Sequence, residues 1–219
     1  SGAVVSIEEL GPSDRGLACE SECWHCGGRL VARLGKRVRP HFAHHRQADE
    51  DPRCGETALH RLGKWLISRM DKLPLPSLPA NSLNTIGRHG AVLLGPGDEL
   101  FGENCPVEIA TVAEEVPLKS GVRPDLVVTG EAAGLTLTLA VEIKVTHGVD
   151  DEKLERLTQD DITTVEIDLG EVYQAGGYSI IDVERALKEP SNQQLVYCAR
   201  TLIETTATSG AVRQWQSLE

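Results

Sequence analysis

Cysteine and histidine residues gathered near the start of the chain constrain its fold more than any other feature. Cys23 and Cys26 lie three positions apart, and Gly27 follows them. Two thiolates at this spacing, with a glycine that permits a tight turn, are typical of a zinc knuckle. In a reducing compartment, clustered cysteine and histidine residues indicate metal ligands rather than disulfides. The pattern therefore predicts a structural zinc site.

The second pair of zinc ligands stays open on spacing alone. His41 and His44 are spaced for ligation, and Cys54 also fits. A closed site with four protein ligands stabilises a small module that lacks a core of its own, and it leaves no position for catalysis. We therefore expect the zinc to hold a module over residues 1–55.

Charge is divided unevenly along the chain of 219 residues, whose net charge is −11. Residues 1–70 carry 11 Lys and Arg against 9 Asp and Glu, whereas residues 71–219 carry 11 against 24. Such asymmetry indicates a polyanion as partner of the basic end, with Arg33, Arg37 and Arg39 as candidate phosphate contacts. The alternative is a well-solvated surface. Aromatic residues make up 4%, so base stacking is not expected to dominate binding.

Export and membrane insertion find no support in the sequence. No apolar run approaches the roughly 18–20 residues of a membrane-spanning helix. No leader with a charged and then an apolar segment opens the chain. We expect a cytoplasmic protein without a membrane partner.

Hydrophobic periodicity after the module alternates between helix and strand. Apolar residues recur at helical spacing over 57–70, and the prolines of 73–79 indicate an extended connector. The strands are expected at 107–116, 122–129, 135–145 and 164–169, with a helix at 150–157 and a mostly helical tail from 181 that breaks at Pro190. This order predicts an α/β (α+β) fold with a mixed sheet flanked by helices. We expect a core over 56–170 and a mostly helical extension over 171–219.

Charged residues of the two central strands are candidates for catalysis. A hairpin turn at 130–134 would bring Asp125 and Glu142 to neighbouring rungs, and Lys144 shares a face with Glu142. Two carboxylates and an ammonium group that converge on one point suit hydrolysis of phosphodiesters with Mg²⁺ or Mn²⁺. In this interpretation the carboxylates bind the cation and Lys144 stabilises developing negative charge.

The alternative is that these three residues are ordinary polar groups on a solvent face. Against this, alternate positions of the second strand form an apolar face, and a helix should cover the other face. A buried cluster of charges is costly unless it coordinates something. We therefore favour a metal site.

Pro124-Asp125 and Glu142-x-Lys144, preceded by a helix, resemble the PD-(D/E)XK nuclease superfamily. Other segments are similar to a narrower group, the competence protein CoiA-like family. They are Arg39-Pro40-His41-Phe42-Ala43-His44, Cys54, Glu56 to Lys64, Val141 to His147, Asp150 to Lys153, Val165 to Leu169 and Arg213-Gln214-Trp215. The resemblance covers most of the chain from Cys23 onward.

This resemblance implies a restriction-endonuclease-like core with a zinc-ribbon-like module. It favours His44 and Cys54 as the remaining zinc ligands, with His41 in reserve. It also implies an extra acidic residue from the helix, here Glu56, whose alternative role is to favour the helix dipole.

Further substrate contacts are expected around the acidic residues. His60 and Lys64 follow Glu56 at steps of four and share its helical face, and Arg123 precedes the first strand acid. All three are candidate substrate-binding residues, although His60 and Lys64 could equally be surface residues. Weaker candidates are Glu115 for a second metal, and His147, Asp150 and Lys153 for substrate, with a helix cap as the alternative for Asp150.

We therefore expect a Mg²⁺- or Mn²⁺-dependent nuclease that acts on DNA, with a structural zinc module that aids substrate binding. The second hypothesis is a catalytically silent nuclease fold that binds a partner protein or a nucleic acid. The third is an RNA-directed nuclease in defence. Intact Asp125, Glu142 and Lys144 favour the first hypothesis.

Overall fold

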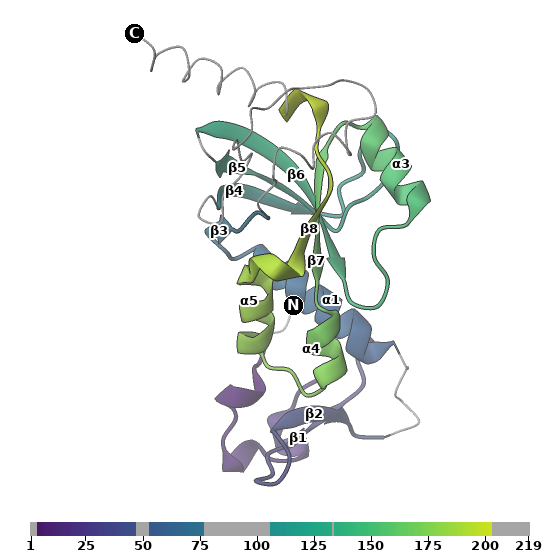
Figure 1. Cartoon of the computed structure of the whole chain (residues 1–219). Coiled ribbons are helices and arrows are strands. Elements are labelled where there is room, and N and C mark those ends of the chain that lie inside the picture. The colour runs from purple at the N-terminus through teal and green to yellow at the C-terminus, as the bar shows by residue number, and fades with distance from the viewer. Residues whose placement is uncertain (1–3, 47–52, 77–105, 133, 203–219) are drawn as a thin grey trace.

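The computed structural model describes residues 4–46, 53–76, 106–132 and 134–202, which form a mixed α/β structure (Figure 1). Short 3-10 helices come first, a two-stranded hairpin follows, and a six-stranded sheet with helices comes last. The α-helices are α1 (Cys54–Ile67), α3 (Asp151–Gln159), α4 (Gly170–Ala175) and α5 (Ile180–Lys188), and the 3-10 helices are Ile7–Glu9, Pro12–Asp14, Leu17–Cys19 and Pro190–Asn192. The strands are β1 (Leu30–Arg33), β2 (His41–His44), β3 (Lys72–Leu73), β4 (Val107–Glu114), β5 (Leu126–Ala132), β6 (Leu135–Lys144), β7 (Thr163–Asp168) and β8 (Gln193–Tyr197).

The six-stranded sheet has the order β3-β4-β5-β6-β7-β8. Neighbouring strands are antiparallel except β6 and β7, which are parallel. A parallel neighbour requires a crossover, and α3 lies within that connection. The parallel register sets Glu142 beside Glu166 and Lys144 beside Asp168. Charged residues of β6 and β7 therefore share one face of the sheet.

Both faces of β6 are covered, which explains how a polar residue on this strand becomes buried. Val141 is fully buried in the main core, which also contains residues of α1 and α5. Gly63 of α1 permits close packing on this face, because a Cβ there would lie 3.0 Å from Cδ1 of Ile143. On the other face, Ala140 shares a smaller core with Leu157 of α3. Glu142 belongs to this second face.

The β1–β2 hairpin and the residues before it form a small module that docks on the rest of the chain. In Figure 1, α4 and α5 lie between this module and the six-stranded sheet. Arg39 forms an ion pair with Asp182 of α5 and donates a hydrogen bond to Ser179 Oγ at 3.4 Å. Tyr178 Oη donates to the carbonyl oxygen of Gly55 at 3.2 Å. These contacts tie the module and the first turn of α1 to the start of α5.

The predicted mixed sheet flanked by helices is confirmed, with shifted element bounds. The strand expected at 122–129 begins only at Leu126. Pro124 has no N–H for a ladder, and Val122 instead accepts a hydrogen bond from Leu118 N at 2.8 Å. The first helix begins at Cys54 rather than at Thr57.

The prediction of a mostly helical tail is wrong at Gln193–Tyr197, which form β8 and pair antiparallel with β7. This five-residue run on the sheet edge is too short for its periodicity to stand out. Helix α5 ends before Pro190, as predicted. Residues 77–79 of the connector and Arg213-Gln214-Trp215 lie outside the described residues.

Within the described ranges, no helix combines the length and the apolar character that crossing a membrane requires.

Candidate functional site

Asp125 and Glu142, called the acid pair below, lie where β5 begins and β6 ends. Leu126 pairs with Val141 in the hairpin, so Asp125 lies opposite Glu142 on the next rung. Residues opposite each other on antiparallel strands have Cβ atoms about 4.5–5.5 Å apart and point to one face. The side chain of Glu142 is 6% exposed and that of Asp125 is 15% exposed. The structure therefore brings together the two carboxylates that the hairpin pattern pairs, in a largely buried position.

Glu142 is only partly satisfied by protein donors. Its Oε2 atom accepts a hydrogen bond from Lys153 Nζ at 2.6 Å. Its Oε1 atom is buried and has no hydrogen-bond partner among the described residues. Burial, followed by the charge of Asp125, raises the pKa of Glu142 to about 7. A buried carboxylate oxygen without a donor costs free energy unless a proton or a cation meets it.

The pKa of Asp125 is lowered, although this residue is also largely buried. Burial acts to raise its pKa, but His60 and the backbone N–H of Ile143 hold that pKa below its usual value. Asp125 Oδ2 accepts a hydrogen bond from Ile143 N at 2.8 Å and lies 2.9 Å from His60 Nε2. Neighbouring carboxyl groups whose pKa values diverge in this way are typical of functional sites.

Helix α1 presents Glu56, His60 and Lys64 on one face, as their spacing of four residues predicts. His60 contacts the acid pair, as described above. Lys64 Nζ donates to Glu115 Oε1 at 2.6 Å, and this hydrogen bond lowers the pKa of Glu115. Glu56 accepts a hydrogen bond from Thr146 Oγ1. The helix therefore places His60 in the site, while the other two residues bind groups around it.

The ammonium group of Lys144 is directed toward β7 rather than toward the acid pair. Nζ of Lys144 donates to Asp168 Oδ2 at 2.6 Å and lies 4.0 Å from Glu166 Oε1. The hydrogen bond to Asp168 raises the pKa of Lys144, so this group stays charged. Asp168 is itself fixed by the backbone N–H of Gly170, at 2.7 Å. The expected convergence of Lys144 with the acid pair is therefore not observed.

The ammonium group that contacts the acid pair belongs to Lys153, in the first turn of α3. Asp150 caps this helix by accepting a hydrogen bond from Lys153 N at 2.7 Å, the alternative role weighed for Asp150. Glu166 Oε2 accepts a hydrogen bond from Val149 N at 2.7 Å. Gly148 packs against the same carboxylate, since a Cβ there would lie 2.5 Å from Oε2. The segment before α3 is therefore held on the sheet, which fixes the position of Lys153.

Sequence reasoning missed Glu166 and Asp168 as members of this charged cluster. They occupy alternate positions of β7, and the parallel register sets them beside Glu142 and Lys144. The available signal was two acidic residues spaced by two within an otherwise uncharged strand. Their contacts depend on which strand lies next to β7, which strand periodicity does not specify.

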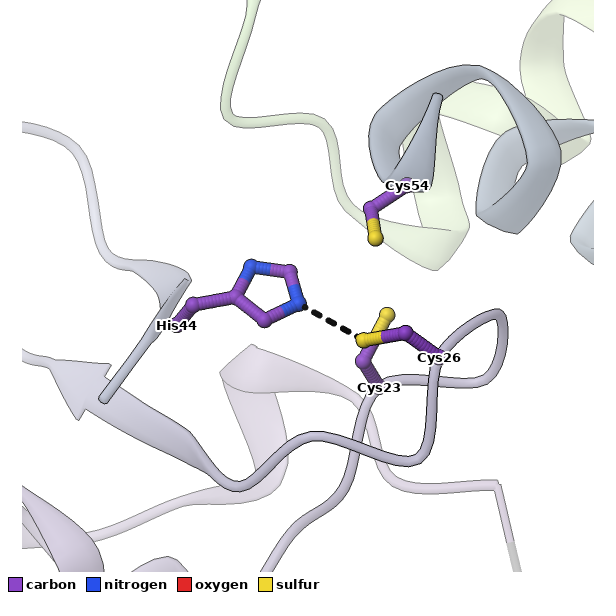
Figure 2. Close-up of side chains that lie close together, drawn as sticks. All are labelled: Cys23, Cys26, His44 and Cys54. Atoms are coloured by element: carbon purple, nitrogen blue, oxygen red, sulfur yellow. Dashed lines mark hydrogen bonds between the residues drawn. The ribbon is translucent and has the colours of Figure 1, made fainter. Parts of the chain in front are cut away.

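A second group of ligands lies between the module and α1. The side chains of Cys23, Cys26, His44 and Cys54, called the Cys3His group below, point toward one another (Figure 2). Their ligand atoms all lie within 4.8 Å of one another, and Cys26 Sγ is 3.3 Å from His44 Nε2. These four residues could hold a metal ion such as zinc, for which thiolate and imidazole ligands are typical.

The turn that follows Cys26 favours the thiolate form of this residue. The backbone N–H of Gly28 donates to Cys26 Sγ at 3.3 Å and is the main cause that lowers the pKa of this thiol to about 7. The thiolate is the form that binds metals. His41, the reserve ligand, lies outside the Cys3His group, and its Nδ1 atom is 2.9 Å from the carbonyl oxygen of Arg39.

The predicted phosphate-binding arginines differ in their surroundings. Arg33 and Arg37 are exposed on the module, and Arg33 and Arg15 line an open hollow of about 520 Å³ there. No residue of the acid pair lines this hollow. Arg39 contributes to docking of the module through its ion pair with α5. Arg123 is exposed directly before Pro124 and the acid pair.

No protein-family model matches the chain, and neither a curated protein nor a solved structure matches it. The resemblance to the CoiA-like family therefore stays a prediction from the residues quoted above.

Proposed function

We propose that this chain is a metal-dependent nuclease that hydrolyses the phosphodiester bonds of DNA. The observation that carries the proposal is the acid pair, in which Glu142 Oε1 is buried and receives no hydrogen bond from the part of the chain that the structure describes. A divalent cation would satisfy this oxygen and relieve the repulsion between Glu142 and Asp125. Carboxylate oxygens are the ligands that Mg²⁺ and Mn²⁺ prefer.

Asp125 and Glu142 would hold the cation, which supplies an activated water and neutralises charge on the phosphate. His60 and the Ile143 N–H orient the Asp125 carboxylate through their contacts with Oδ2. Glu56 is proposed as an additional acidic residue from α1. The motif assigns to Lys144 the positive charge that stabilises the transition state.

Zinc is proposed as the ion of the Cys3His group, with a structural role. A set of three thiols and one imidazole uses all four positions of a tetrahedral zinc site, so no position is left for substrate. The acid pair offers only oxygen ligands, which suit a harder ion. The two groups of ligands therefore serve different metals.

DNA is the proposed substrate because residues 1–70 carry a net positive charge, whereas residues 71–219 are strongly acidic. Arg33 and Arg37 on the module and Arg123 beside the acid pair are exposed and would contact phosphates. His60 and Lys64 are proposed as further substrate-binding residues of α1. The resemblance to the CoiA-like family supports DNA as the nucleic acid.

Cleavage assays on the whole chain test this proposal. Single- and double-stranded DNA and RNA are incubated with Mg²⁺, with Mn²⁺ or without divalent cation, and Asp125→Asn is compared with the parent. Because the cation contributes several kcal/mol to stabilising the transition state, we expect Asp125→Asn to lower the rate by at least ~100-fold. Asp160→Asn is the control, since the carboxylate of Asp160 accepts a hydrogen bond from Ser120 Oγ.

Four outcomes would contradict the proposal. Cleavage that is independent of divalent cations, or equal rates in the parent and Asp125→Asn, would reject the acid pair as the metal site. Cleavage of RNA but not of DNA would show that RNA is the substrate. Binding of DNA without any cleavage would favour the catalytically silent module.

A further inference from the structure

We propose that Lys153 supplies the ammonium group at the reaction centre, the role that the sequence motif assigns to Lys144. This inference rests on the proposed nuclease function and deepens it. It concerns which positive charge lies beside the acid pair when a phosphate arrives.

The two lysines differ in their carboxylate partners. Lys153 Nζ lies 2.6 Å from Glu142 Oε2, so its charge is directly at the acid pair. Lys144 Nζ lies 2.6 Å from Asp168 Oδ2 and 4.0 Å from Glu166 Oε1. The carboxylates beside Lys144 belong to β7, whereas the carboxylate beside Lys153 belongs to the acid pair. Lys153 is therefore the better placed of the two to offset negative charge at the acid pair.

Hydrogen bonds fix the backbone around Lys153, and its side chain extends from there to Glu142. The cap from Asp150 holds Lys153 N, and Glu166 holds the preceding segment through Val149 N. The Lys153 side chain is 30% exposed, whereas that of Glu142 is 6% exposed. The ammonium group thus lies between a buried carboxylate and solvent, where an incoming phosphate would meet it.

Hydrolysis forms a bond between phosphorus and a water oxygen and breaks the bond between phosphorus and the sugar oxygen that leaves. The water loses a proton, and the leaving oxygen gains one. Lys153 takes no part in this proton transfer. Its ammonium group donates hydrogen bonds to a non-bridging phosphate oxygen, where negative charge increases in the transition state. Lys153 is therefore expected to act on kcat more than on KM.

The test compares Lys153→Met and Lys144→Met in the whole chain. The matched control is Lys188→Met, since Lys188 forms a comparable ion pair with Glu184 on α5. Rates of DNA cleavage are measured with Mn²⁺, and Mn²⁺ affinity is measured separately by calorimetry. Loss of one charged donor at the reacting phosphate costs about 10²–10³-fold in kcat. We expect a loss of this size in Lys153→Met and a smaller one in Lys144→Met.

Mn²⁺ affinity separates a catalytic role from a structural one. Lys153→Met should bind Mn²⁺ at least as tightly as the parent, because a positive charge that competes for Glu142 is removed. Lys153→Arg keeps the charge, so it should fold like the parent and recover part of the lost rate.

Two results would overturn the inference while leaving the nuclease function intact. The first is a Lys153→Met variant that cleaves within threefold of the parent, or faster than Lys144→Met. The second is a loss of rate that is matched by an equal loss of Mn²⁺ affinity, which would make Lys153 a support for Glu142. A parent chain that binds Mn²⁺ but cleaves no nucleic acid would reject the proposed function, and this inference with it.

Discussion

Replacing Glu142 by glutamine should stabilise the metal-free protein above neutral pH. Burial and the nearby charge of Asp125 raise the pKa of Glu142 from 4.5 to about 7. Each unit corresponds to about 1.4 kcal/mol, so ionised Glu142 costs the fold about 3 kcal/mol relative to the neutral form. Glutamine has the shape of the neutral carboxyl group and removes this cost. The side chain is 6% exposed, so solvent screens little of the effect.

The gain in stability of Glu142→Gln over the parent should increase with pH, because the pKa of Glu142 is raised in the folded state. A carboxyl group whose pKa is raised in the folded state contributes its full stability below pH 4.5, and that contribution is lost as the pH rises through about 7. The parent and Glu142→Gln should therefore have similar free energies of unfolding at about pH 4. At about pH 8 the variant should be more stable by about 2–3 kcal/mol. Asp125 does not change this window, because its pKa is lowered below 3.8.

Mn²⁺ should stabilise the parent more than Glu142→Gln and so reverse the order of their stabilities. A ligand that binds only the folded state at 100 times its Kd adds about 2.7 kcal/mol to the free energy of unfolding. The parent should gain this amount, and Glu142→Gln should gain little, because it has lost one of the two carboxylates proposed to bind the cation. The two effects together distinguish a metal site from a merely buried carboxyl group.

Urea unfolding, followed by circular dichroism at about pH 4 and pH 8 with and without Mn²⁺, measures these differences. Glu131→Gln on the same hairpin is the control, since Glu131 is exposed. It should stay within about 0.5 kcal/mol of the parent under all conditions. A Glu142→Gln variant that is no more stable than the parent at pH 8, or that Mn²⁺ stabilises as much as the parent, would refute the reasoning.

Two further predictions concern the module. Cys23→Ser combined with Cys26→Ser should remove about one zinc per chain and lower DNA cleavage, because the Cys3His group holds the start of α1, whereas Asp125→Asn should retain the zinc. Metal analysis of both variants checks this, and zinc retained by the cysteine variant would contradict it. Arg33→Glu with Arg37→Glu should weaken DNA binding and reduce the slope of log affinity against log salt by about one per lost phosphate contact. Unchanged affinity and slope in a salt titration would show that these arginines form an ordinary solvated surface.

The acid pair could be predicted from sequence because strand geometry has a period of two. The turn expected at 130–134 places the two residues on neighbouring rungs. In the structure Ala132 pairs with Leu135, so the strands extend further and Asp125 lies opposite Glu142. The Cys3His group could also be predicted, since short spacing and ligand chemistry restrict the choice to a few residues. In both cases the relevant contacts are set locally or by one turn.

The partners of the two lysines could not be predicted in the same way. Lys144 binds Asp168 because β7 returns parallel to β6 in one particular register, which depends on how α3 packs against the sheet. Lys153 reaches Glu142 only because the loop before α3 is held by Glu166. Such contacts join residues of separate elements, and neither hydrophobic periodicity nor a motif contains the packing that selects them.

Helix α1 links the Cys3His group to the acid pair. Cys54, the first residue of α1, contributes a ligand atom to the Cys3His group, and His60 reaches Asp125 less than two turns later. A 14-residue helix is rigid over that distance, and Gly63 holds it close to Ile143 of β6. A metal in the Cys3His group would therefore fix the start of the helix that orients Asp125. The module would in this way belong to the framework of the site, in addition to the proposed role of its arginines in binding phosphates.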